Sequence, residues 1–528
     1  MEVSISLSIL SLCAKLIWII IVVTWIWRVV NWVWLRPKRL EKYLKKQGFK
    51  GTPYRVLFGD LKESSKMMKE AKSKPINLSD DVVPRIIPFL HLTVNKYGKD
   101  SFIWIGPTPR VNITNPEHVK DILMKLGDFP KPRVNPIVYL LATGLSDYEG
   151  EKWVKHRRII NQAFHLEKLK HMVPAFYVSC NEMLTKWEQL MVKQNGNDKE
   201  FGEIDVWPYL QNLTGDVISR TAFGSSYEEA KALFQLQKEQ AELANKAIQT
   251  VYIPGWRFLP TKLNKRMKQI DRQVQTLLKE LINKREKAMR AGEAGHDDLL
   301  GIMMESNFKE IKEHGNNKNV GMSIRDVIEE CKLFYFAGQE TTSSLLVWTM
   351  VLLSRFPHWQ ARARDEVLQV FGDNTPDFEG LSHLKVVTMI LYEVLRLYPP
   401  AIFINRTVHE KTQLGNMSIP AGVELSIPTI LVHCDREFWG EDAKEFNPER
   451  FAEGVSKATK GQVSFFPFGW GPRICIGQNF ALIEAKMAIA LILQRFIFEL
   501  SPAYAHAPIT VLILQPEFGA HLILQKRY

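Results

Sequence analysis

The loop from Phe468 to Gly477, Phe-Gly-Trp-Gly-Pro-Arg-Ile-Cys-Ile-Gly, constrains this chain more than any other stretch. Cys475 lies among glycines, and an accessible, deprotonated thiol of this kind can ligate a metal. Gly471 and Gly477 allow the backbone to approach a flat cofactor closely. Arg473 carries a rigid fork of donors that can pair with a cofactor carboxylate. The alternative is a buried structural cysteine in a glycine-rich turn.

The residues that follow, Gln478 to Ala490, have the composition of an apolar helix. Cys475 is therefore expected just before a helix N-terminus, where the partial positive charge lowers the pKa of a thiol. The sequence thus predicts a metal-binding loop with a helix behind it.

Trp153 and Arg157 are four residues apart in a stretch expected to be helical, so they share one face. Both side chains can donate hydrogen bonds to the carboxylates of a cofactor. By itself the pair is slightly more typical of a basic surface helix with a half-buried tryptophan. Lys155, His156 and Arg158 are expected to extend a basic surface that could receive an acidic partner protein.

The stretch Leu333 to Thr342 opens a long apolar helix that contains Glu340 and Thr341. Polar side chains inside an apolar helix need a partner or a function, and Gly338 removes a side chain at the same turn. This combination suits a groove in which dioxygen sits over a metal and the acid and alcohol relay protons. The alternatives are a threonine bonded back to its own helix and a surface glutamate.

Glu393 and Arg396 are three residues apart on a helix rich in leucine and valine, so we expect them to be buried and paired. The prolines after Tyr398 should end this helix. We assign the pair to structure, not to catalysis.

The run from Leu16 to Leu35 is apolar except for Thr24, Arg28 and Asn31. Twenty helical residues span about 30 Å, the thickness of the hydrocarbon core of a bilayer. A cleaved secretory signal is the alternative, but no small-residue cleavage site follows the run. Seven Lys or Arg residues between positions 36 and 50, against one acid, place the rest of the chain on the cytoplasmic side.

The rest of the chain predicts a mainly α fold with small β-sheets. The sequence between Asp100 and Thr114 predicts a β-hairpin. Polar stretches at 193–202, 284–298 and 310–323 are expected as exposed connections. The five cysteines are too few and scattered for a disulfide framework. The net charge of +12 fits a membrane surface or an acidic protein, and without a zinc module or an aromatic-interleaved basic groove we expect no nucleic-acid partner.

These motifs resemble, in order and spacing, those of the cytochrome P450 superfamily, over about the whole chain. Four stretches resemble the plant seventy-two family in particular: 34–41, 253–262, 337–342 and 466–475. The resemblance implies the cytochrome P450 fold preceded by a transmembrane helix. We expect an anchor at 1–35, a basic linker at 36–60 and a haem-thiolate catalytic domain at 61–528. The usual proline-rich hinge after the anchor is here only Arg-Pro-Lys-Arg.

The resemblance also implies residue roles. Cys475 would be the axial ligand of a haem b iron, and Glu340 and Thr341 would act in catalysis. The cofactor would contact Trp153, Arg157, Arg406, Phe468, Arg473 and Gly477. Arg450 would complete a structural triad with Glu393 and Arg396. The substrate pocket would include Phe336, Ala337, Ile402, Phe403, Ile404 and Phe518.

The implied activity is an NADPH- and O2-dependent hydroxylation of a terpenoid, in the endoplasmic reticulum membrane, with a separate flavoprotein reductase as partner. An oleanane-type triterpenoid is the first expectation, followed by an iridoid of the deoxyloganic or loganin type and a gibberellin-like diterpenoid. A haem-thiolate isomerase and a non-catalytic haem-binding sensor are the alternatives in other classes.

Overall fold

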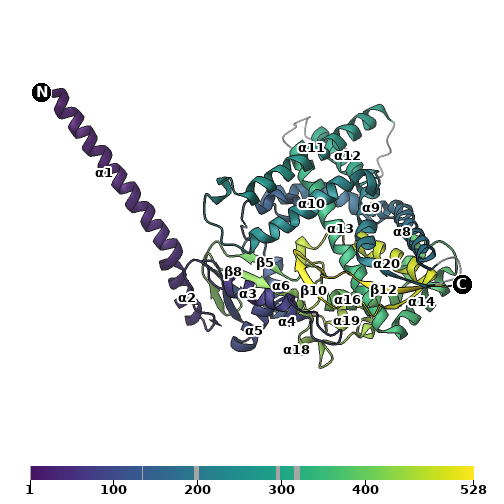
Figure 1. Cartoon of the computed structure of the whole chain (residues 1–528). Helices are drawn as coiled ribbons and strands as arrows, with labels where there is room; N and C mark the ends of the chain where they lie inside the picture. Colours follow the sequence, from purple (N-terminus) through teal and green to yellow (C-terminus); the bar gives the residue numbers. More distant parts are fainter. Residues whose placement is uncertain (1, 134, 196–200, 293–297, 314–320, 528) are drawn as a thin grey trace.

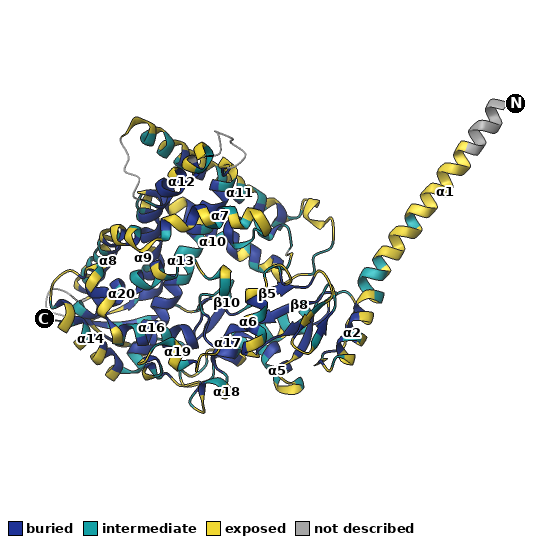
Figure 2. Cartoon of the chain, turned by 180° about the vertical axis from the view of Figure 1, so that it is seen from behind, coloured by how far each residue is buried: buried dark blue, intermediate teal, exposed yellow. Residues whose placement is uncertain are grey.

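One long helix leaves the body of the molecule in the computed structural model, which describes residues 2–133, 135–195, 201–292, 298–313 and 321–527. This helix, α1 (Glu2–Val30), projects away from all other elements (Figure 1). Its side chains are exposed along most of its described length, while the body has a buried core (Figure 2). Among the described residues, Leu10–Lys46 is the one helical stretch long and apolar enough to cross a membrane. The expected anchor is therefore present as a helix.

The helix continues past the anchor without a flexible break. A π-helical turn, Asn31–Leu35, joins α1 directly to α2 (Arg36–Lys46). Pro37 has no N–H, so it cannot donate to the carbonyl of Val33 as an ordinary helical residue would. The hydroxyl of Tyr54 donates to that carbonyl instead, at 2.5 Å. The Arg-Pro-Lys-Arg sequence thus lies in a helix that is fastened to the domain.

The body begins with a five-stranded sheet in the order β1-β2-β3-β8-β5. The strands β2 (Ser101–Ile105) and β3 (Thr108–Asn112) form the hairpin that the sequence predicts. The other members are β1 (Lys50–Gly51), β8 (Glu424–Ile427) and β5 (Ile404–Thr407). Leu40 and Leu44 of α2 belong to the core of this part. The division into anchor, linker and catalytic domain stays a prediction, but the segment 36–60 supplies buried side chains to the domain.

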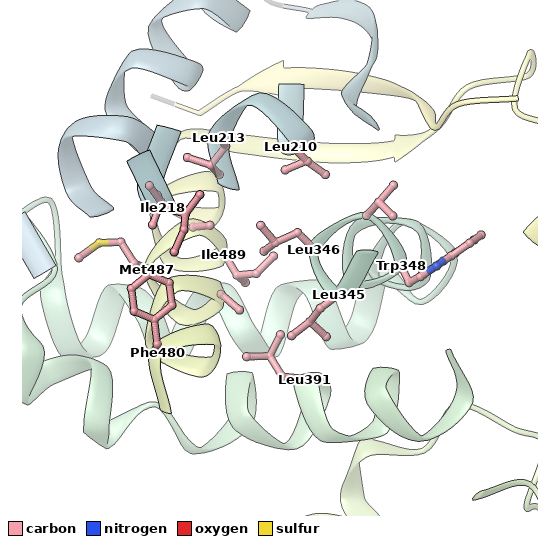
Figure 3. Close-up of a cluster of buried hydrophobic side chains, with 14 of the residues drawn as sticks. Leu210, Leu213, Ile218, Leu345, Leu346, Trp348, Leu391, Phe480, Met487 and Ile489 are labelled. Carbon is pink, nitrogen blue, oxygen red and sulfur yellow. The ribbon is translucent and has the colours of Figure 1, made fainter. Parts of the chain in front are cut away.

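Helices form most of the body, around the long helix α13 (Ile324–Arg355). Figure 3 shows apolar side chains of α9, α13, α16 and α20 meeting in one cluster of the core. The helices that make up this part are α7 (Gly150–Asn161), α8 (Leu166–Asn195), α9 (Val206–Phe223), α10 (Tyr227–Ile248), α11 (Lys262–Ala291), α12 (Leu299–Glu313), α14 (Pro357–Phe371), α15 (Phe378–His383), α16 (Lys385–Leu397) and α20 (Gln478–Arg495). The helix expected after the cysteine loop is α20. The shorter helices are α3 (Leu61–Lys72), α4 (Val83–Ile86), α5 (Pro88–Tyr97), α6 (Pro116–Met124), α17 (Thr429–His433), α18 (Arg436–Trp439) and α19 (Val455–Ala458).

Three smaller sheets complete the fold. One has the order β4-β12-β9, and two are antiparallel pairs, β6-β7 and β10-β11. Their strands are β4 (Phe201–Asp205), β12 (His521–Lys526), β9 (Phe496–Leu500), β6 (Thr412–Leu414), β7 (Met417–Ile419), β10 (Pro508–Val511) and β11 (Ile513–Pro516). The prediction of a mainly α fold with small sheets is confirmed.

The three polar stretches expected as connections lie partly outside the described residues. The prediction for 284–298 is wrong where the structure describes its first half, because α11 continues to Ala291. Charged side chains spaced along an exposed helical face have the same composition as a loop, which explains the error.

The buried ion pair of α16 lies where the sequence predicts it. The guanidinium of Arg396 donates from Nε and Nη2 to the two carboxylate oxygens of Glu393, at 2.8 and 2.7 Å, and both side chains are fully buried. Arg396 also donates to the carbonyl of His433 at 2.7 Å. Arg450 Nε lies 3.4 Å from Glu393 Oε1. The helix ends before Tyr398, as the prolines require.

Breaking this pair should destabilise the protein strongly. Arg396→Ala leaves the carboxylate of Glu393 buried without its main partner, at a cost of about 3–5 kcal/mol. Arg362→Ala removes the exposed ion pair with Glu449 and should cost about 0–1 kcal/mol. Thermal unfolding of both variants is the measurement. Equal unfolding midpoints would contradict the structural role of the pair.

Candidate active site

The cysteine loop is held by its own backbone and by one buried histidine. The amide of Cys475 donates to the carbonyl of Phe468 at 2.8 Å, which closes the loop. Gly471 has φ +72°, and a Cβ there would lie 2.7 Å from the carbonyl oxygen of Leu123, so only glycine fits. The amide of Phe466 donates to Nε2 of His433 at 3.0 Å. The loop therefore has one conformation, set by contacts before and after it.

The side chain of Cys475 lies deep in the protein and is still exposed on one side, so it faces an internal space. Burial raises the pKa of this thiol, while a hydrogen bond from the Gly477 amide and the charge of Arg157 act to lower it. The amide at the start of α20 thus lowers the pKa as expected, but in the protein by itself burial outweighs this effect. Arg157 Nη1 donates to the carbonyl of Ile474 at 2.9 Å, which brings the positive charge next to the loop.

Several basic side chains gather beside this internal space. Arg473 stacks over the ring of Trp153, 4.5 Å from its centroid, and donates to the carboxylate of Glu149 at 2.6 Å. Arg406 is buried on β5, and burial, together with the charge of Arg473, lowers the pKa of its guanidinium to about 10. Burial and Arg473 lower the pKa of Lys131 to about 8. Like charges are thus held close together in a poorly solvated place.

This basic cluster (Lys131, Arg157, Arg406 and Arg473) carries unused donors. Nε of Arg406 and Nη1 of Arg473 are buried and have no hydrogen-bond partner among the described residues. Buried donors without partners are costly unless a ligand satisfies them. A cavity of about 690 Å³ borders part of the cluster: Lys131, Trp153 and Arg473 line it, and Cys475, Arg157 and Arg406 do not. A flat cofactor with two carboxylates beside the thiol fits this donor set.

The middle of α13 presents one half-buried face inside an otherwise buried helix. Leu333, Phe336, Ala337, Glu340 and Thr341 are half-buried and recur every three to four residues, whereas most of their neighbours are buried. Because such spacing marks one face of a helix, this face borders an internal cavity. The cavity face has an acid and an alcohol side by side in an apolar stripe.

The two polar residues of this face have different environments. The hydroxyl of Thr341 donates to the carbonyl of Ala337 at 2.6 Å, so the back-bonded state given above as an alternative does exist in the structure. Burial raises the pKa of Glu340 to about 7. A carboxyl with such a pKa exchanges its proton near neutral pH.

The expected pocket residues do not all lie together. Phe336 packs with the apolar cluster of α10 and residues 137–142, and Leu512 at the β10–β11 turn joins that cluster. Ile402 is buried in the main core and Phe403 and Ile404 are half-buried. Phe518, however, is 49% exposed. Leu512, with its unusual φ of +66°, is the apolar residue of the C-terminal hairpins that the prediction missed.

His156 corrects the expected basic surface of α7. Its ring is buried, with Nδ1 at 2.6 Å from Glu330 Oε1 on α13. The other oxygen of Glu330 accepts from the amide of Leu145 at 3.0 Å, and Thr143 donates to Glu329 at 2.8 Å. The loop before α7 is thereby tied to α13. Of Lys155, His156 and Arg158, the residues expected to form that surface, Arg158 alone is exposed.

The comparisons with known proteins agree with this geometry. A model of the family "Cytochrome P450" matches residues 87–523. The chain belongs to the cytochrome P450 family. It is 63% identical over 517 residues to cytochrome P450 CYP72A219 of Panax ginseng, which covers 98% of this chain and 99% of that protein. It is 59% identical over 495 residues to 7-deoxyloganic acid hydroxylase of Catharanthus roseus, covering 93% and 94%. Within the family it is a plant seventy-two cytochrome P450.

A solved structure has the same fold. The retinoic acid-bound cyanobacterial CYP120A1 superposes with a TM-score of 0.73, over 90% of this chain and 99% of that one, at 21% identity. As a cytochrome P450 the protein is a haem-thiolate monooxygenase. Its cofactor is haem b, and its electrons come from NADPH through a reductase.

The raised pKa of Glu340 predicts a pH-dependent stability. Between the ordinary pKa of 4.5 and about 7 the folded protein holds a proton that the unfolded chain releases. The free energy of unfolding should therefore fall as the pH rises through this window, and Glu340→Gln should remove that part of the fall. Thermal unfolding from pH 5 to 8 measures it, with Glu228→Gln on the surface as the control. Parallel profiles for wild type and Glu340→Gln would contradict the raised pKa.

Proposed function

We propose that this monooxygenase hydroxylates a terpenoid and that the residues of the basic cluster hold its haem. Cys475 would hold the haem iron through its thiol, which faces the internal space beside the basic cluster. Arg406 and Arg473, with the unused donors, would pair with the haem carboxylates, and Trp153 and Arg157 would support them. Phe468 and Gly477 would shape the loop that carries the thiol. The bound haem supplies the activation of dioxygen for hydroxylation of a C–H bond.

Glu340 and Thr341 are proposed to deliver protons. Both side chains lie on the cavity face of α13, and the pKa of Glu340 near 7 lets it take up and release a proton at cellular pH. The hydroxyl of Thr341, one residue further along the same turn, is both donor and acceptor. The position of Glu340 and Thr341 on this face and the chemistry of their side chains support the proposed proton delivery.

The apolar lining favours a large hydrophobic substrate, and this observation carries the choice of substrate. Phe336 of the cavity face packs against an apolar cluster with side chains from α10, α11, residues 137–142 and Leu512. An oleanane-type triterpenoid buries its carbon skeleton in such a lining. An iridoid acid is the second candidate, because one relative at 59% identity is named 7-deoxyloganic acid hydroxylase. An iridoid glucoside carries many hydroxyl groups, which need partners when buried.

The location is proposed from the anchor and its flanking charges. The exposed apolar helix α1 is followed by the basic helix α2, which favours a single-pass anchor with the domain in the cytoplasm. The loop before α11 exposes Trp256, Phe258 and Leu259, which suits contact with lipid. The endoplasmic reticulum and a flavoprotein NADPH–cytochrome reductase complete the proposal.

The test is product analysis with microsomes that contain this protein and a plant reductase. An oleanane acid and 7-deoxyloganic acid are supplied separately, with and without NADPH. A hydroxylated triterpenoid that forms only with NADPH supports the proposal. Oxidation of the iridoid alone moves the substrate to the second candidate, and product without NADPH would favour an isomerase.

Thr341→Ala should separate electron use from product formation. Without the hydroxyl, proton supply from this turn is impaired, so that more NADPH and O2 would be converted to hydrogen peroxide, while haem binding would persist. We expect about a 10- to 100-fold lower ratio of product to NADPH, within the range of general acid–base contributions. The ratio is measured with a peroxide assay and the carbon monoxide difference spectrum. Unchanged coupling would refute the proton-delivery role.

A further inference from the structure

The helices α9 and α13 cross closely at the turn that carries Glu340 and Thr341. A Cβ on Gly338 would lie 2.9 Å from the side chain of Ile218 on α9. A Cβ on Gly215 would lie 3.2 Å from Nε2 of Gln339. Figure 3 shows Leu210, Leu213 and Ile218 of α9 in the same core cluster as Leu345, Leu346 and Trp348 of α13. Small residues on both helices therefore allow backbone and side-chain polar groups to meet across the crossing.

Two buried hydrogen bonds join the helices there, one in each direction. The hydroxyl of Thr214 on α9 lies 2.9 Å from the backbone carbonyl of Gln339, closer than to the carbonyls of its own helix at 3.1 and 3.3 Å, so its shortest hydrogen bond joins the helices. The side-chain amide of Gln339 donates from Nε2 to the carbonyl of Gln211 on α9 at 3.2 Å. Thr214 is fully buried and Gln339 is 8% exposed. Bonds so shielded from water hold their geometry better than surface contacts do.

These bonds lie on the face of α13 away from the cavity. Gln339 is buried against α9, while the next two residues, Glu340 and Thr341, are half-buried on the cavity face. Successive helical residues are about 100° apart around the axis. Fixing the backbone at Gln339 therefore also fixes the direction in which the acid and the alcohol point.

We propose that Thr214 and Gln339 are positioning residues that clamp the turn of Glu340 and Thr341 to α9 and thereby keep NADPH consumption coupled to product. This inference rests on the proposed proton delivery by that pair. Both clamp residues are buried between the two helices. When the clamp is absent, a larger share of turnovers converts NADPH, a proton and O2 to NADP+ and hydrogen peroxide.

Thr214→Val tests the clamp because it keeps the shape of the side chain and removes the donor. Thr221→Val is the matched control, since Thr221 is buried on the same helix and, among the described residues, its hydroxyl bonds to Val217 of that helix alone, at 2.7 Å. Thr214→Ser restores the donor. The full-length enzyme with its reductase is assayed for peroxide per NADPH, KM and kcat.

Thr214→Val should raise the peroxide share about two- to tenfold, the range of one net hydrogen bond, with KM little changed. Thr221→Val should match the wild type, and Thr214→Ser should recover most of the coupling. Hydrogen exchange gives an independent readout, because the amide of Ser343 donates to the carbonyl of Gln339 in a regular helix. Exchange at Ser343 should be faster in Thr214→Val than in Thr221→Val.

The outcomes separate the two proposals. If Thr214→Val matches Thr221→Val in both coupling and exchange, the clamp is refuted. If Thr341→Ala stays coupled while exchange at Ser343 rises in Thr214→Val, the clamp between the helices stands and the proton-delivery role falls, and with it the effect on coupling.

Discussion

The position of the Cys475 thiol depends on a buried ion pair that never touches it. Arg396 holds Glu393 with two of its nitrogens and the carbonyl of His433 with a third. The ring of His433 then accepts a hydrogen bond from the amide of Phe466, two residues before the cysteine loop. Burial lowers the pKa of this histidine to about 3, so the ring stays neutral and able to accept. One charge pair thus connects α16, a short helix and the loop into a single rigid support.

The second support is α13, which serves as core on most faces and as cavity wall on one. Its buried faces pack against α9, α16 and α20, so the helix has little freedom to move. Because the cavity face carries a polar side chain, Glu340 is partly buried, and this burial raises its pKa toward neutrality. Side chains placed on such a helix, and not on a loop, are kept within a narrow range of geometry.

The sequence predicted the features that depend on near neighbours. The hairpin at 101–112, the helix after the cysteine loop and the end of α16 at the prolines all follow from local composition. The Glu393–Arg396 pair needed only a helical spacing. Contacts between distant segments were missed: His156 and Glu330 are 174 positions apart, and Lys131 meets Arg473 only in the folded chain. Phe518 and Leu512 are both apolar residues near a turn, so the sequence does not distinguish them. In the fold Leu512 packs against an apolar cluster, whereas Phe518 is exposed.

The helix continues without interruption from α1 to α2, so it connects to the domain rigidly and not through a flexible linker. The hydroxyl of Tyr54 donates to the carbonyl of Val33 in this helix. Within the helix, Arg39 donates to the side chain of Asn31 at 2.6 Å. A residue inserted into the π-helical turn would rotate the domain about the helix axis by about 100° and shift it along that axis by about 1.5 Å. When α1 lies in a bilayer, the number of residues in this helix therefore sets how the domain is rotated about the helix axis. The side of the domain that faces the lipid is then determined by the sequence, as the cysteine loop is.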